Sequence, residues 1–515
     1  MSTPLPRVTY SNIGADFGPL HAFLDDEIPR FEQAELGKTW ETPFATGPVA
    51  PTSSPLDASI VLGHFPVSSG SDVDAAIASA CDGAKVWNAA RVEERLAFAK
   101  RWHAVLSSMK YKLGIAALYE VGKSRMESIG EAEEAVDMVE FYPEELRRHD
   151  GYREPMNEMV PYETAVSVQR PYGVFAVVAP FNFPVALSIG MLNGALLGGN
   201  SVVYKPSPEC QLTGLLIAQS LKDAGLPDGV FNIVLGGGEV GRALTSDARI
   251  DGVAFTGSHA TGMEIFRHMA GRPWMRPVIA EMGGKNPAYV TASADIERAA
   301  AGVARSAYGL QGQKCSACSV VYVDNAVKDQ FIEALRTFTQ TLAIGDTRDG
   351  AVFMGPVYND AARARFETAM ETARAEGIVH FGGTQVEGMG PNYITPALVE
   401  MDAPSDLSRE ELFLPFLVLR GVDGLEAAMA EGNDVAYGLC AGIFTQDEDE
   451  LERFLDGAEA GVLYANRASG ATTGAWPGGQ PFCGWKGTGI GGKGGLGSWY
   501  IPQFMHEQSR TIMTR

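Results

Sequence analysis

Residues 173–205 read GVFAVVAPFNFPVALSIGMLNGALLGGNSVVYK, and this stretch decides the fold. It begins with an apolar strand (174–178), passes through a loop bounded by prolines and a long apolar segment, and ends in a second apolar strand (202–204). A membrane span of ~20 residues should not be interrupted by prolines, by Asn182 and by several glycines unless protein covers it. The pattern instead predicts strand, loop, buried helix and strand, which is one unit of a parallel sheet.

The same alternation continues on both sides of this unit. Further strands are expected at 231–235, 253–255, 277–280, 320–323, 416–419, 443–445 and 462–465, with helices between them. Apolar strands alternating with helices predict doubly wound sheets covered on both faces, so we expect an α/β protein with two lobes. A helix from about residue 131 should break or kink at Pro143. The hairpin-like segment 152–170 and the tail 499–515 are isolated strands, which suit an arm that pairs edges between subunits.

Length, composition and charge narrow the class of protein. The chain has 515 residues, 45% apolar content, a net charge of −22 and a pI near 4.8. Roughly two to four domains are expected from ~150 residues each. The acidic charge argues against nucleic acid and against an anionic membrane as partners. The first 70 residues, rich in Pro, Ser and Thr, predict loops and edge strands.

Cysteine usage and the N-terminus point to a reducing compartment. The six cysteines are few and scattered, which does not suit a disulfide framework. Residues 1–7 lack the basic-then-apolar layout of a signal peptide. We therefore expect a cytoplasmic location. The sequence contains no HExxH motif and its eight histidines do not cluster, so no metal is expected.

One cysteine lies where a scaffold can display a reactive thiol. Residues 309–318, GLQGQKCSAC, place Cys315 behind a Gly- and Gln-rich turn and just before an apolar strand. Three interpretations compete. Cys315 is a buried structural cysteine, which is the default for a free Cys; or it forms a redox or metal pair with Cys318; or it is a covalent nucleophile.

Two glycine-rich loops follow strands and precede helices. Residues 236–241 (GGGEVG) match the dinucleotide fingerprint GxGxxG, but the acidic residue expected about 20 residues further on is missing. Residues 257–262 (GSHATG) have the same position between strand and helix, and their helix N-terminus suits a phosphate. Lys205 ends a strand and suits a ribose hydroxyl or a phosphate. Two such loops on one sheet favour a dinucleotide over plain tight turns.

Two polar side chains in apolar surroundings are candidates for the chemistry. Glu281 ends an apolar strand, where a carboxylate is well placed to act as a base. Asn182 carries an amide that either has buried partners or serves as a donor for an oxyanion. Taken singly, a structural role explains each of them at least as well.

Six motifs together resemble the aldehyde dehydrogenase superfamily in order and approximate spacing. They are PFNFP (180–184), KPS (205–207), FTGS (255–258), EMGGK (281–285), GQKC (312–315) and ELF (411–413). The resemblance spans about residues 60–512. It implies an aldehyde dehydrogenase-like fold with a Rossmann-type NAD(P)-binding domain (1–149 and 171–281), a catalytic domain (282–494) and a β oligomerisation arm (150–170 and 495–515). A homodimer or homotetramer formed by edge-strand pairing is expected from it.

The resemblance also assigns roles to residues. Cys315 attacks the aldehyde carbonyl, the Asn182 amide and the Cys315 backbone N–H hold the oxyanion, hydride passes to the nicotinamide, and Glu281 activates the water that hydrolyses the thioester. CoA-acylating relatives lack that base. Within the cofactor set, Lys205 holds the adenosine ribose and Glu411 and Phe413 hold the nicotinamide ribose. The cofactor-binding residues expected are Pro180, Lys205, Ser207, Gly238, Thr256, Gly257, Ser258, Gly262, Glu411 and Phe413.

The segment 473–484, TGAWPGGQPFCG, looks like the substrate anchor loop of the superfamily branch that oxidises L-glutamate γ-semialdehyde, the open form of 1-pyrroline-5-carboxylate. In that branch the substrate's α-carboxylate is gripped by backbone N–H groups of the loop and by nearby donors, and a carboxylate accepts from its ammonium. On this sequence the substrate-binding residues are Glu134, Phe183, Lys314, Ser316, Gly474, Ala475 and Phe482. The resemblance therefore predicts NAD(P)-dependent oxidation of this small-molecule aldehyde in proline catabolism.

The sequence departs from the family pattern at several positions. Leu414 and Cys483 stand where glycine is usual, and Val320 where arginine is usual. Pro208 stands where NAD-strict relatives carry a glutamate, with Glu209 one residue late. NAD is the expected cofactor and NADP stays open.

Several alternatives to this function stay open as well. Another semialdehyde, or an aliphatic or aromatic aldehyde, is one alternative substrate class. A thiol-redox protein using Cys315 and Cys318 is an alternative of another class. A non-catalytic structural paralogue is a third, and the joint presence of Cys315, Glu281 and Asn182 argues against it.

Overall fold

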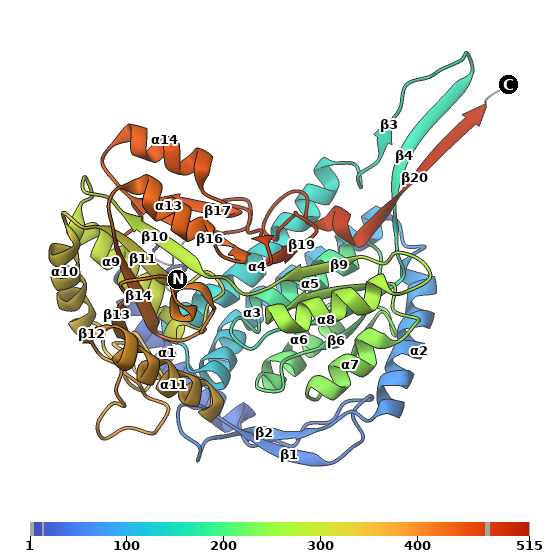
Figure 1. Cartoon of the computed structure of the whole chain (residues 1–515). Helices are drawn as coiled ribbons and strands as arrows, with labels where there is room; N and C mark the ends of the chain where they lie inside the picture. Colours follow the sequence, from blue (N-terminus) through green and yellow to red (C-terminus); the bar gives the residue numbers. More distant parts are fainter. Residues whose placement is uncertain (1–4, 13–14, 469–473, 514–515) are drawn as a thin grey trace.

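The computed structural model describes residues 5–12, 15–468 and 474–513. Two sheets flanked by helices form two lobes, and a third, antiparallel sheet projects away from them (Figure 1). The α/β class and the two-lobe arrangement expected from the sequence are confirmed.

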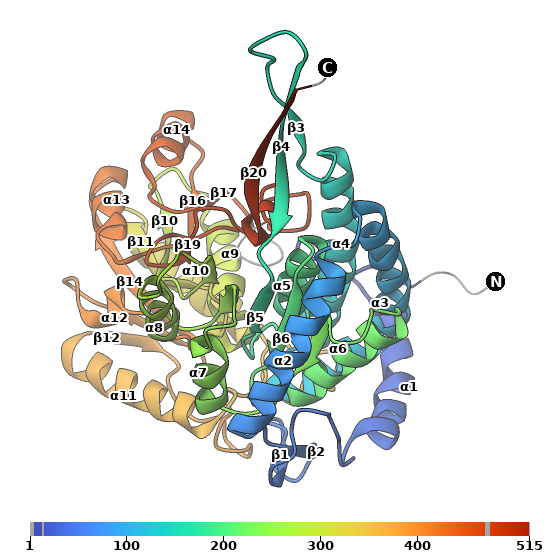
Figure 2. The ribbon, with the colours of Figure 1, turned by 90° about the vertical axis from the view of Figure 1, so that its right-hand side faces the viewer.

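The first sheet has six strands in the order β19-β9-β8-β5-β6-β7. Neighbouring strands from β9 to β7 run parallel, and β19 pairs antiparallel with β9 at the edge. The strands are β5 (Val174–Val178), β6 (Ser201–Lys205), β7 (Phe231–Ile233), β8 (Gly252–Thr256), β9 (Val278–Glu281) and β19 (Gly489–Ile490). The helices around it are α2 (Gly70–Trp87), α5 (Ala186–Leu197), α6 (Gln211–Asp223), α7 (Gly238–Ser246) and α8 (His259–Ala270) (Figure 2). Strand β6 is buried throughout, as an apolar strand inside a parallel sheet should be.

The second sheet has seven strands in the order β12-β13-β14-β11-β10-β16-β17, all parallel except the β12–β13 pair. Its strands are β10 (Asn286–Val290), β11 (Cys318–Asp324), β12 (Ile378–Phe381), β13 (Ala397–Glu400), β14 (Phe416–Val422), β16 (Cys440–Phe444) and β17 (Val462–Ala465). Its helices are α9 (Ile296–Tyr308), α10 (Lys328–Gln340), α11 (Asp360–Glu376), α12 (Asp406–Arg409), α13 (Leu425–Asn433) and α14 (Glu448–Gly457). The short strands β15 (Tyr437–Gly438) and β18 (Trp485–Lys486) pair with each other.

Two long helices, α3 (Val92–Val121) and α4 (Arg125–Arg148), form an antiparallel hairpin beside the first sheet. Gly122 ends α3 in the left-handed conformation (φ +77°), and the Ser124 side chain caps α4. Helix α4 continues past Pro143, so of the expected break or kink the break does not occur. Packing of α4 against α3 and α5 offsets the hydrogen bond that a proline removes.

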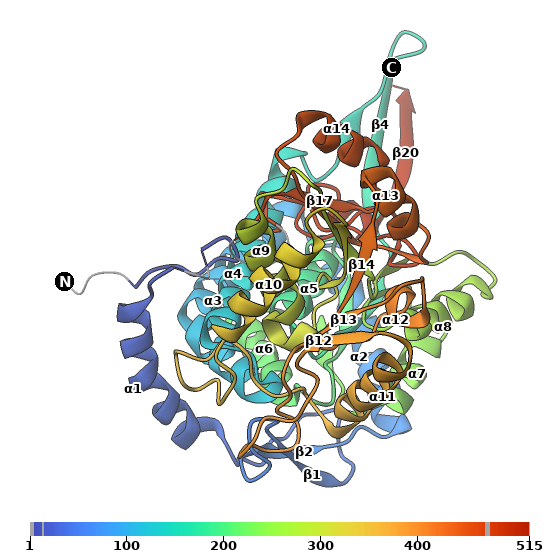
Figure 3. The same cartoon turned by 60° about the vertical axis from the view of Figure 1, so that its left-hand side comes forward.

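The N-terminal region differs from the prediction of loops and edge strands. Residues Gly18–Glu35 form a helix, α1, at the periphery of the molecule (Figure 3), and β1 (Val49–Ser53) and β2 (Val61–Pro66) then pair as a hairpin. Leu20, Leu24, Ile28 and Phe31 are buried at helical spacing. The region's Pro, Ser and Thr content concealed that apolar stripe.

The third sheet joins the two segments that stand apart in the sequence. Strand β20 (Met505–Met513) pairs antiparallel with β4 (Glu163–Pro171) along its whole length, and β3 (Glu154–Pro155) pairs with the other side of β4. The sheet extends away from both lobes (Figures 1 and 2). The expected strand character is confirmed for these ranges, although residues Ile501–Phe504 of the tail form a 3-10 helix instead. The role of the two segments in oligomers stays a prediction.

Within the described residues, no helix is both long enough and apolar enough to cross a membrane. In the same part of the chain, no group of three or more His, Cys, Asp and Glu side chains could hold a metal ion.

Candidate active site

The chain passes directly from the first sheet to the second, and this short crossing builds the site. Glu281 is the last residue of β9, and Asn286 is the first residue of β10. Because β10 pairs in parallel with β11, Asn286 lies opposite Cys318. Its Nδ2 donates to the backbone oxygens of Cys315 (2.6 Å) and Ala317 (2.9 Å). The crossing therefore fixes the end of one sheet against the segment that carries Cys315.

A cavity of about 480 Å³ lies at this junction. Cys315 and Glu281 both line it, which brings together the two residues that the sequence proposed as nucleophile and base. The other predicted site residues in its wall are Glu134, Phe183, Thr256, Lys314, Ser316, Ala475 and Phe482. Its size and its mixture of apolar and polar walls are those of a small-molecule site.

The turn before Cys315 has an unusual backbone. Leu310 and Gln311 adopt left-handed conformations (φ +50° and +56°), followed by Gly312 at φ +65°. A Cβ at Gly312 would lie 2.1 Å from the backbone oxygen of Leu414. Backbone strain of this kind is typical of functional sites and persists only where the surroundings enforce it. Leu414, which departs from the family's usual glycine, is itself buried in the core of the second lobe.

Burial is the largest cause that raises the pKa of the Cys315 thiol to about 12, and the nearby carboxylates of Glu411 and Glu281 contribute to the same rise. The backbone N–H groups of Ser316 and Cys315 act in the opposite direction. In the ligand-free site the thiol is therefore protonated at neutral pH. A base or a positive charge must favour the thiolate before it can attack.

Cys318 lies on the other side of the segment, in the core. It is the first residue of β11, it is 1% exposed, and its Sγ donates to the Val320 carbonyl oxygen at 3.4 Å. Both Cys315 and Cys318 are free thiols. The CxxC spacing therefore comprises one cavity-lining thiol and one core-filling thiol.

The Glu281 carboxyl group is largely shielded from solvent. Burial raises its pKa to about 8, although the Gly484 N–H donates to its Oε2 at 3.1 Å and favours the ionised form. A base with a pKa near the working pH transfers protons efficiently. Gly484 belongs to the loop expected to anchor the substrate, so this loop also fixes the carboxylate.

Asn182 is buried (3% exposed) in the loop between β5 and α5. Its Nδ2 donates to the backbone oxygen of Gln313 at 3.0 Å, two residues before Cys315. The amide carries two N–H donors, so this bond leaves a second one. Pro180 precedes it in the same loop and is partly exposed.

Lys205 and the first glycine-rich loop meet outside the cavity. Lys205 Nζ donates to the backbone oxygens of Gly236 (2.8 Å) and Pro206 (3.0 Å). Burial lowers the pKa of Lys205 to about 8. Ser207 donates to the Glu209 carboxylate, so the glutamate that arrives one residue late still faces this segment.

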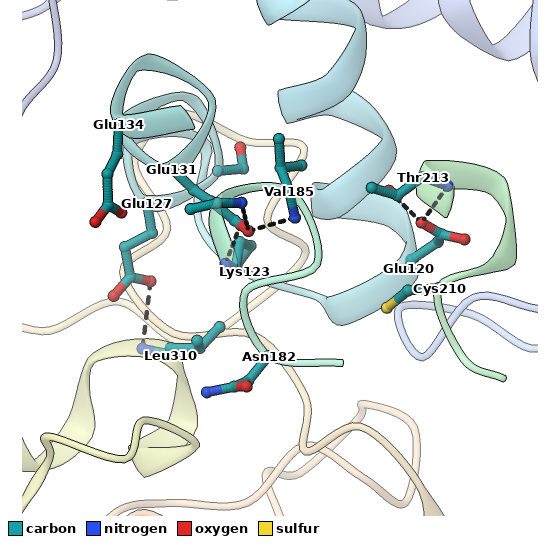
Figure 4. Close-up of polar contacts among 12 residues, drawn as sticks. Glu120, Lys123, Glu127, Glu131, Glu134, Asn182, Val185, Cys210, Thr213 and Leu310 are labelled. Carbon is teal, nitrogen blue, oxygen red and sulfur yellow. Dashed lines mark hydrogen bonds and ion pairs between the residues drawn. The ribbon is translucent and has the colours of Figure 1, made fainter. Parts of the chain in front are cut away.

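The helix N-termini around the first sheet are not equivalent. Those of α5 and α6 are capped by the buried carboxylates of Glu131 and Glu120 (Figure 4). The N-terminus of α7 has Gly237 as its cap and Gly238, exposed, as its first residue, whereas α8 is capped by its own Ser258. Of these four helices, α7 is therefore the one whose N-terminal N–H groups have no side-chain cap, which suits a phosphate.

The second glycine-rich loop packs closely on the crossing segment. Thr256 ends β8 and lines the cavity, and the Gly257 N–H donates to the Glu281 backbone oxygen at 3.2 Å. A Cβ at Gly262 would lie 2.3 Å from the Met282 sulfur. A larger residue at position 262 would therefore have to displace the Met282 side chain, which follows Glu281.

Glu411 and Phe413 lie on the opposite side of the crossing. The Gly284 N–H donates to Glu411 Oε1 at 2.9 Å, and burial raises the pKa of Glu411 to about 7. Phe413 has a φ of +60°, and its ring meets the Phe181 ring edge to face at 6.0 Å. Neither residue belongs to the cavity wall, but Glu411 lies close enough to Cys315 to raise the pKa of its thiol.

The predicted acceptor for a substrate ammonium already has a partner. Glu134 is buried, and the Tyr10 hydroxyl donates to its Oε2 at 2.5 Å. Burial raises the pKa of Glu134 to about 8. The Tyr10 ring packs edge-on against Phe183 (6.2 Å) and Trp476 (5.4 Å). The N-terminal segment thus closes one side of the cavity.

The predicted donors for a substrate carboxylate divide into two groups. Lys314 and Ser316 flank Cys315 in the cavity wall, and Lys314 Nζ lies 3.5 Å from Glu127 Oε1. In the anchor loop, Ala475 lines the cavity, whereas Gly474 does not and its N–H donates to Gln480 Oε1 at 2.9 Å. Thr473, at the start of that loop, lies outside the described residues.

Sequence reasoning missed two residues of this site. Asn286 directly follows the EMGGK motif without being part of it, yet it holds the backbone of Cys315 and accepts from the Cys440 N–H at 3.0 Å. Tyr10 lies in a segment with no motif. It lines the cavity and donates to Glu134, which lies 124 residues further along the chain. A polar residue at the first position of a buried strand was the available signal for Asn286. We find none for Tyr10.

Comparison with known proteins agrees with this geometry. The model of the aldehyde dehydrogenase family matches residues 45–509. The chain therefore belongs to the aldehyde dehydrogenase family, as the six motifs predicted.

Individual relatives show which enzymes within this family the chain is similar to. A 1-pyrroline-5-carboxylate dehydrogenase of Geobacillus sp. (strain WCH70) is 32% identical over 501 residues, covering 95% of each chain. An N-succinylglutamate 5-semialdehyde dehydrogenase of Caulobacter sp. (strain K31) is 37% identical over 420 residues, covering 81% of this chain and 85% of the relative. The crystal structure of a Thermus 1-pyrroline-5-carboxylate dehydrogenase with bound NAD superimposes with a TM-score of 0.92 at 29% identity, covering 100% of both chains.

Proposed function

We propose that this protein oxidises L-glutamate γ-semialdehyde, the open form of 1-pyrroline-5-carboxylate, to L-glutamate with NAD(P). The observation that carries the proposal is the cavity in which Cys315 and Glu281 share a wall with polar groups suited to a small zwitterion. Lys314 and Ser316 supply donors beside the nucleophile, and Glu134 supplies an acceptor. The names of the Geobacillus and Thermus relatives support the same substrate.

The reaction then follows from the chemistry of the residues. The Cys315 thiolate attacks the aldehyde carbon, and the carbonyl oxygen becomes an alkoxide that the Asn182 amide and the Cys315 N–H stabilise. NAD(P), when bound, accepts the hydride whose loss turns this thiohemiacetal into a thioester on Cys315. Glu281 takes a proton from the water that attacks the thioester, and the cysteine sulfur leaves as the acid forms.

The residues around the first sheet fit a dinucleotide. Lys205, Ser207 and Gly238 would hold the adenosine end, and the uncapped N-terminus of α7 suits a phosphate. Pro180, Thr256, Gly257, Ser258, Gly262, Glu411 and Phe413 would hold the remainder. The Glu209 carboxylate beside Ser207 supports NAD over NADP, because it would repel a 2′-phosphate.

A second candidate substrate is N-succinylglutamate 5-semialdehyde. The Caulobacter relative of that name is 37% identical. An acylated amine carries no positive charge, and Glu134, whose pKa is raised to about 8 and which already accepts from Tyr10, suits an uncharged neighbour. The two candidates differ in whether Glu134 meets an ammonium.

The test is a comparison of kcat/KM, with NAD and with NADP. The substrates are 1-pyrroline-5-carboxylate, N-succinylglutamate 5-semialdehyde, succinic semialdehyde, hexanal and benzaldehyde. The proposal predicts that 1-pyrroline-5-carboxylate with NAD gives the highest value. A higher value for the succinylated aldehyde would replace the first candidate with the second, and a higher value for any other aldehyde would refute both.

We further propose that residues 1–149 and 171–281 form the NAD(P)-binding domain and that residues 282–494 form the catalytic domain. Strand β19 belongs to the second range but pairs with β9 of the first sheet.

Residues 150–170 and 495–515 would join subunits into a homodimer or homotetramer. Strand β20 lies at the edge of its sheet and carries the exposed side chains of Ile512 and Met513, which supports pairing with another copy. The free cysteines support a cytoplasmic location. Light scattering of the full chain measures the oligomer, and a monomer would refute the arm's role.

A further inference from the structure

We propose that Glu131 and Lys123, a buried ion pair away from the reacting atoms, are positioning residues for the oxyanion-binding loop. The proposal rests on the proposed function, because it assumes that Asn182 stabilises the alkoxide. Neither residue belongs to the cavity wall, so each would act through the loop that carries Asn182.

The pair is fully buried and its contacts are directional. Glu131 and Lys123 side chains are both 0% exposed, and Glu131 Oε2 lies 2.6 Å from Lys123 Nζ. The other oxygen, Oε1, accepts from the backbone N–H groups of Val185 (2.7 Å) and Ala186 (3.1 Å) (Figure 4). These are the first N–H groups of α5, where the helix dipole favours a negative charge.

The contacts reach the catalytic loop within three residues of Asn182. Val185 follows Asn182, Phe183 and Pro184 directly, so the carboxylate fixes the exit of the loop. Lys123 Nζ lies 4.1 Å from the centre of the Phe183 ring, a cation–π contact inside the loop. On its other side, Asn182 donates to Gln313. The loop is thus held from α4 and from the nucleophile's turn, with the Asn182 amide between the two.

The same face of α4 also reaches the nucleophile's turn. Glu127, one helical turn before Glu131, accepts from the Leu310 N–H at 3.2 Å (Figure 4). Residues four apart lie on one helix face. One helix therefore supports both loops, so that a displacement of α4 relative to either loop would change the distance between Cys315 and Asn182.

Two double variants isolate the positioning contact without leaving a buried charge. Lys123→Met/Glu131→Gln keeps an oxygen that can accept from the α5 N–H groups, and Lys123→Met/Glu131→Leu removes it. We expect the Leu variant to form NADH in a single turnover 10–100-fold more slowly than the Gln variant, because a shift of about 1 Å in a catalytic donor costs on that order. The KM for NAD and the rate of Cys315 alkylation by iodoacetamide should stay within twofold, since alkylation forms no oxyanion.

Glu133→Gln is the matched control. Glu133 is a buried glutamate of the same helix that pairs with Lys110 at 2.6 Å and contacts neither loop. Its substitution should leave the single-turnover rate unchanged. If the Leu variant does not fold, Glu131→Asp tests the same point, because it keeps the charge but is one methylene too short to reach both partners. It should show the same loss.

Asn182→Ala separates failure of the inference from failure of the proposed function. If Asn182→Ala keeps the wild-type single-turnover rate, the oxyanion role of Asn182 is wrong, and the positioning proposal falls with it. If Asn182→Ala is slow, the oxyanion role stands and the positioning proposal is tested by itself. It is wrong if the Leu double variant reacts as fast as the Gln double variant. Where the Leu variant does not fold, it is wrong if Glu131→Asp reacts as fast as wild type.

Discussion

In the proposed mechanism, the raised pKa of Glu281 should make thioester hydrolysis depend on pH, and one substitution should remove this dependence. Glu281 acts as a base only when ionised, and burial raises its pKa to about 8. The ionised fraction is then about 9% at pH 7 and about 91% at pH 9. Hydrolysis of the Cys315 thioester should therefore rise about tenfold between these pH values and level off above them.

Glu281→Gln should abolish this rise. The amide cannot take a proton from water, so hydrolysis should slow by about 10²–10⁴-fold, the usual contribution of a general base. Glutamine has the length of glutamate and can still accept from the Gly484 N–H, so the fold should be kept. The first NADH turnover should occur with little subsequent turnover, because attack by Cys315 and hydride loss precede hydrolysis.

Rapid quenching followed by mass spectrometry of the intact protein measures the acyl adduct directly. Between pH 6 and 9.5, wild type should clear the adduct faster as the pH rises, and Glu281→Gln should accumulate it at every pH. Hydrolysis by Glu281→Gln at the wild-type rate, or with the same rise towards pH 9, would refute the role of this carboxylate.

Two other substitutions test the cofactor side. Glu209→Gln removes the carboxylate that accepts from Ser207 beside Lys205. It should raise kcat/KM with NADP about tenfold and change kcat/KM with NAD little, because the loss of about 1.4 kcal/mol of repulsion corresponds to that factor. An unchanged kcat/KM with NADP would contradict this prediction. Gly283→Ala places a Cβ 1.9 Å from Glu411 Oε2, which must displace that carboxylate, so the KM for NAD should rise about tenfold or more while thermal unfolding shifts little. An unchanged KM would show that Glu411 does not bind the cofactor.

The elements that sequence could predict are those whose pattern is local. The apolar strands alternate with helices, and the ends of parallel strands meet at one edge, so the positions of Lys205 and Glu281 followed from the strand ends. The six motifs added the family and therefore the partnership of Cys315 with Glu281. Helix α1 had a local signal as well, in the spacing of Leu20, Leu24 and Ile28, which a compositional view of the first 70 residues concealed.

The remaining features depend on contacts between residues far apart in the chain. Glu127, Glu131 and Glu134 have helical spacing, but acidic residues at that spacing normally face solvent. The burial of Glu131 and Glu134 becomes intelligible only with partners such as the α5 N-terminus and Tyr10, which no local pattern connects to α4. The extra support of Cys315 by Asn286 likewise arises from strand register, which the sequence alone does not specify.

The central claim is that Cys315, and not its neighbour Cys318, carries the covalent step. Glu281→Gln protein mixed with 1-pyrroline-5-carboxylate and NAD, then acid-quenched and digested, should yield the acyl group on Cys315. Cys318→Ser should keep kcat/KM within about twofold, because Cys318 is a core thiol outside the cavity wall, and Cys315→Ser should lose it. An acyl group on Cys318, or oxidation that survives Cys315→Ser, would contradict the account.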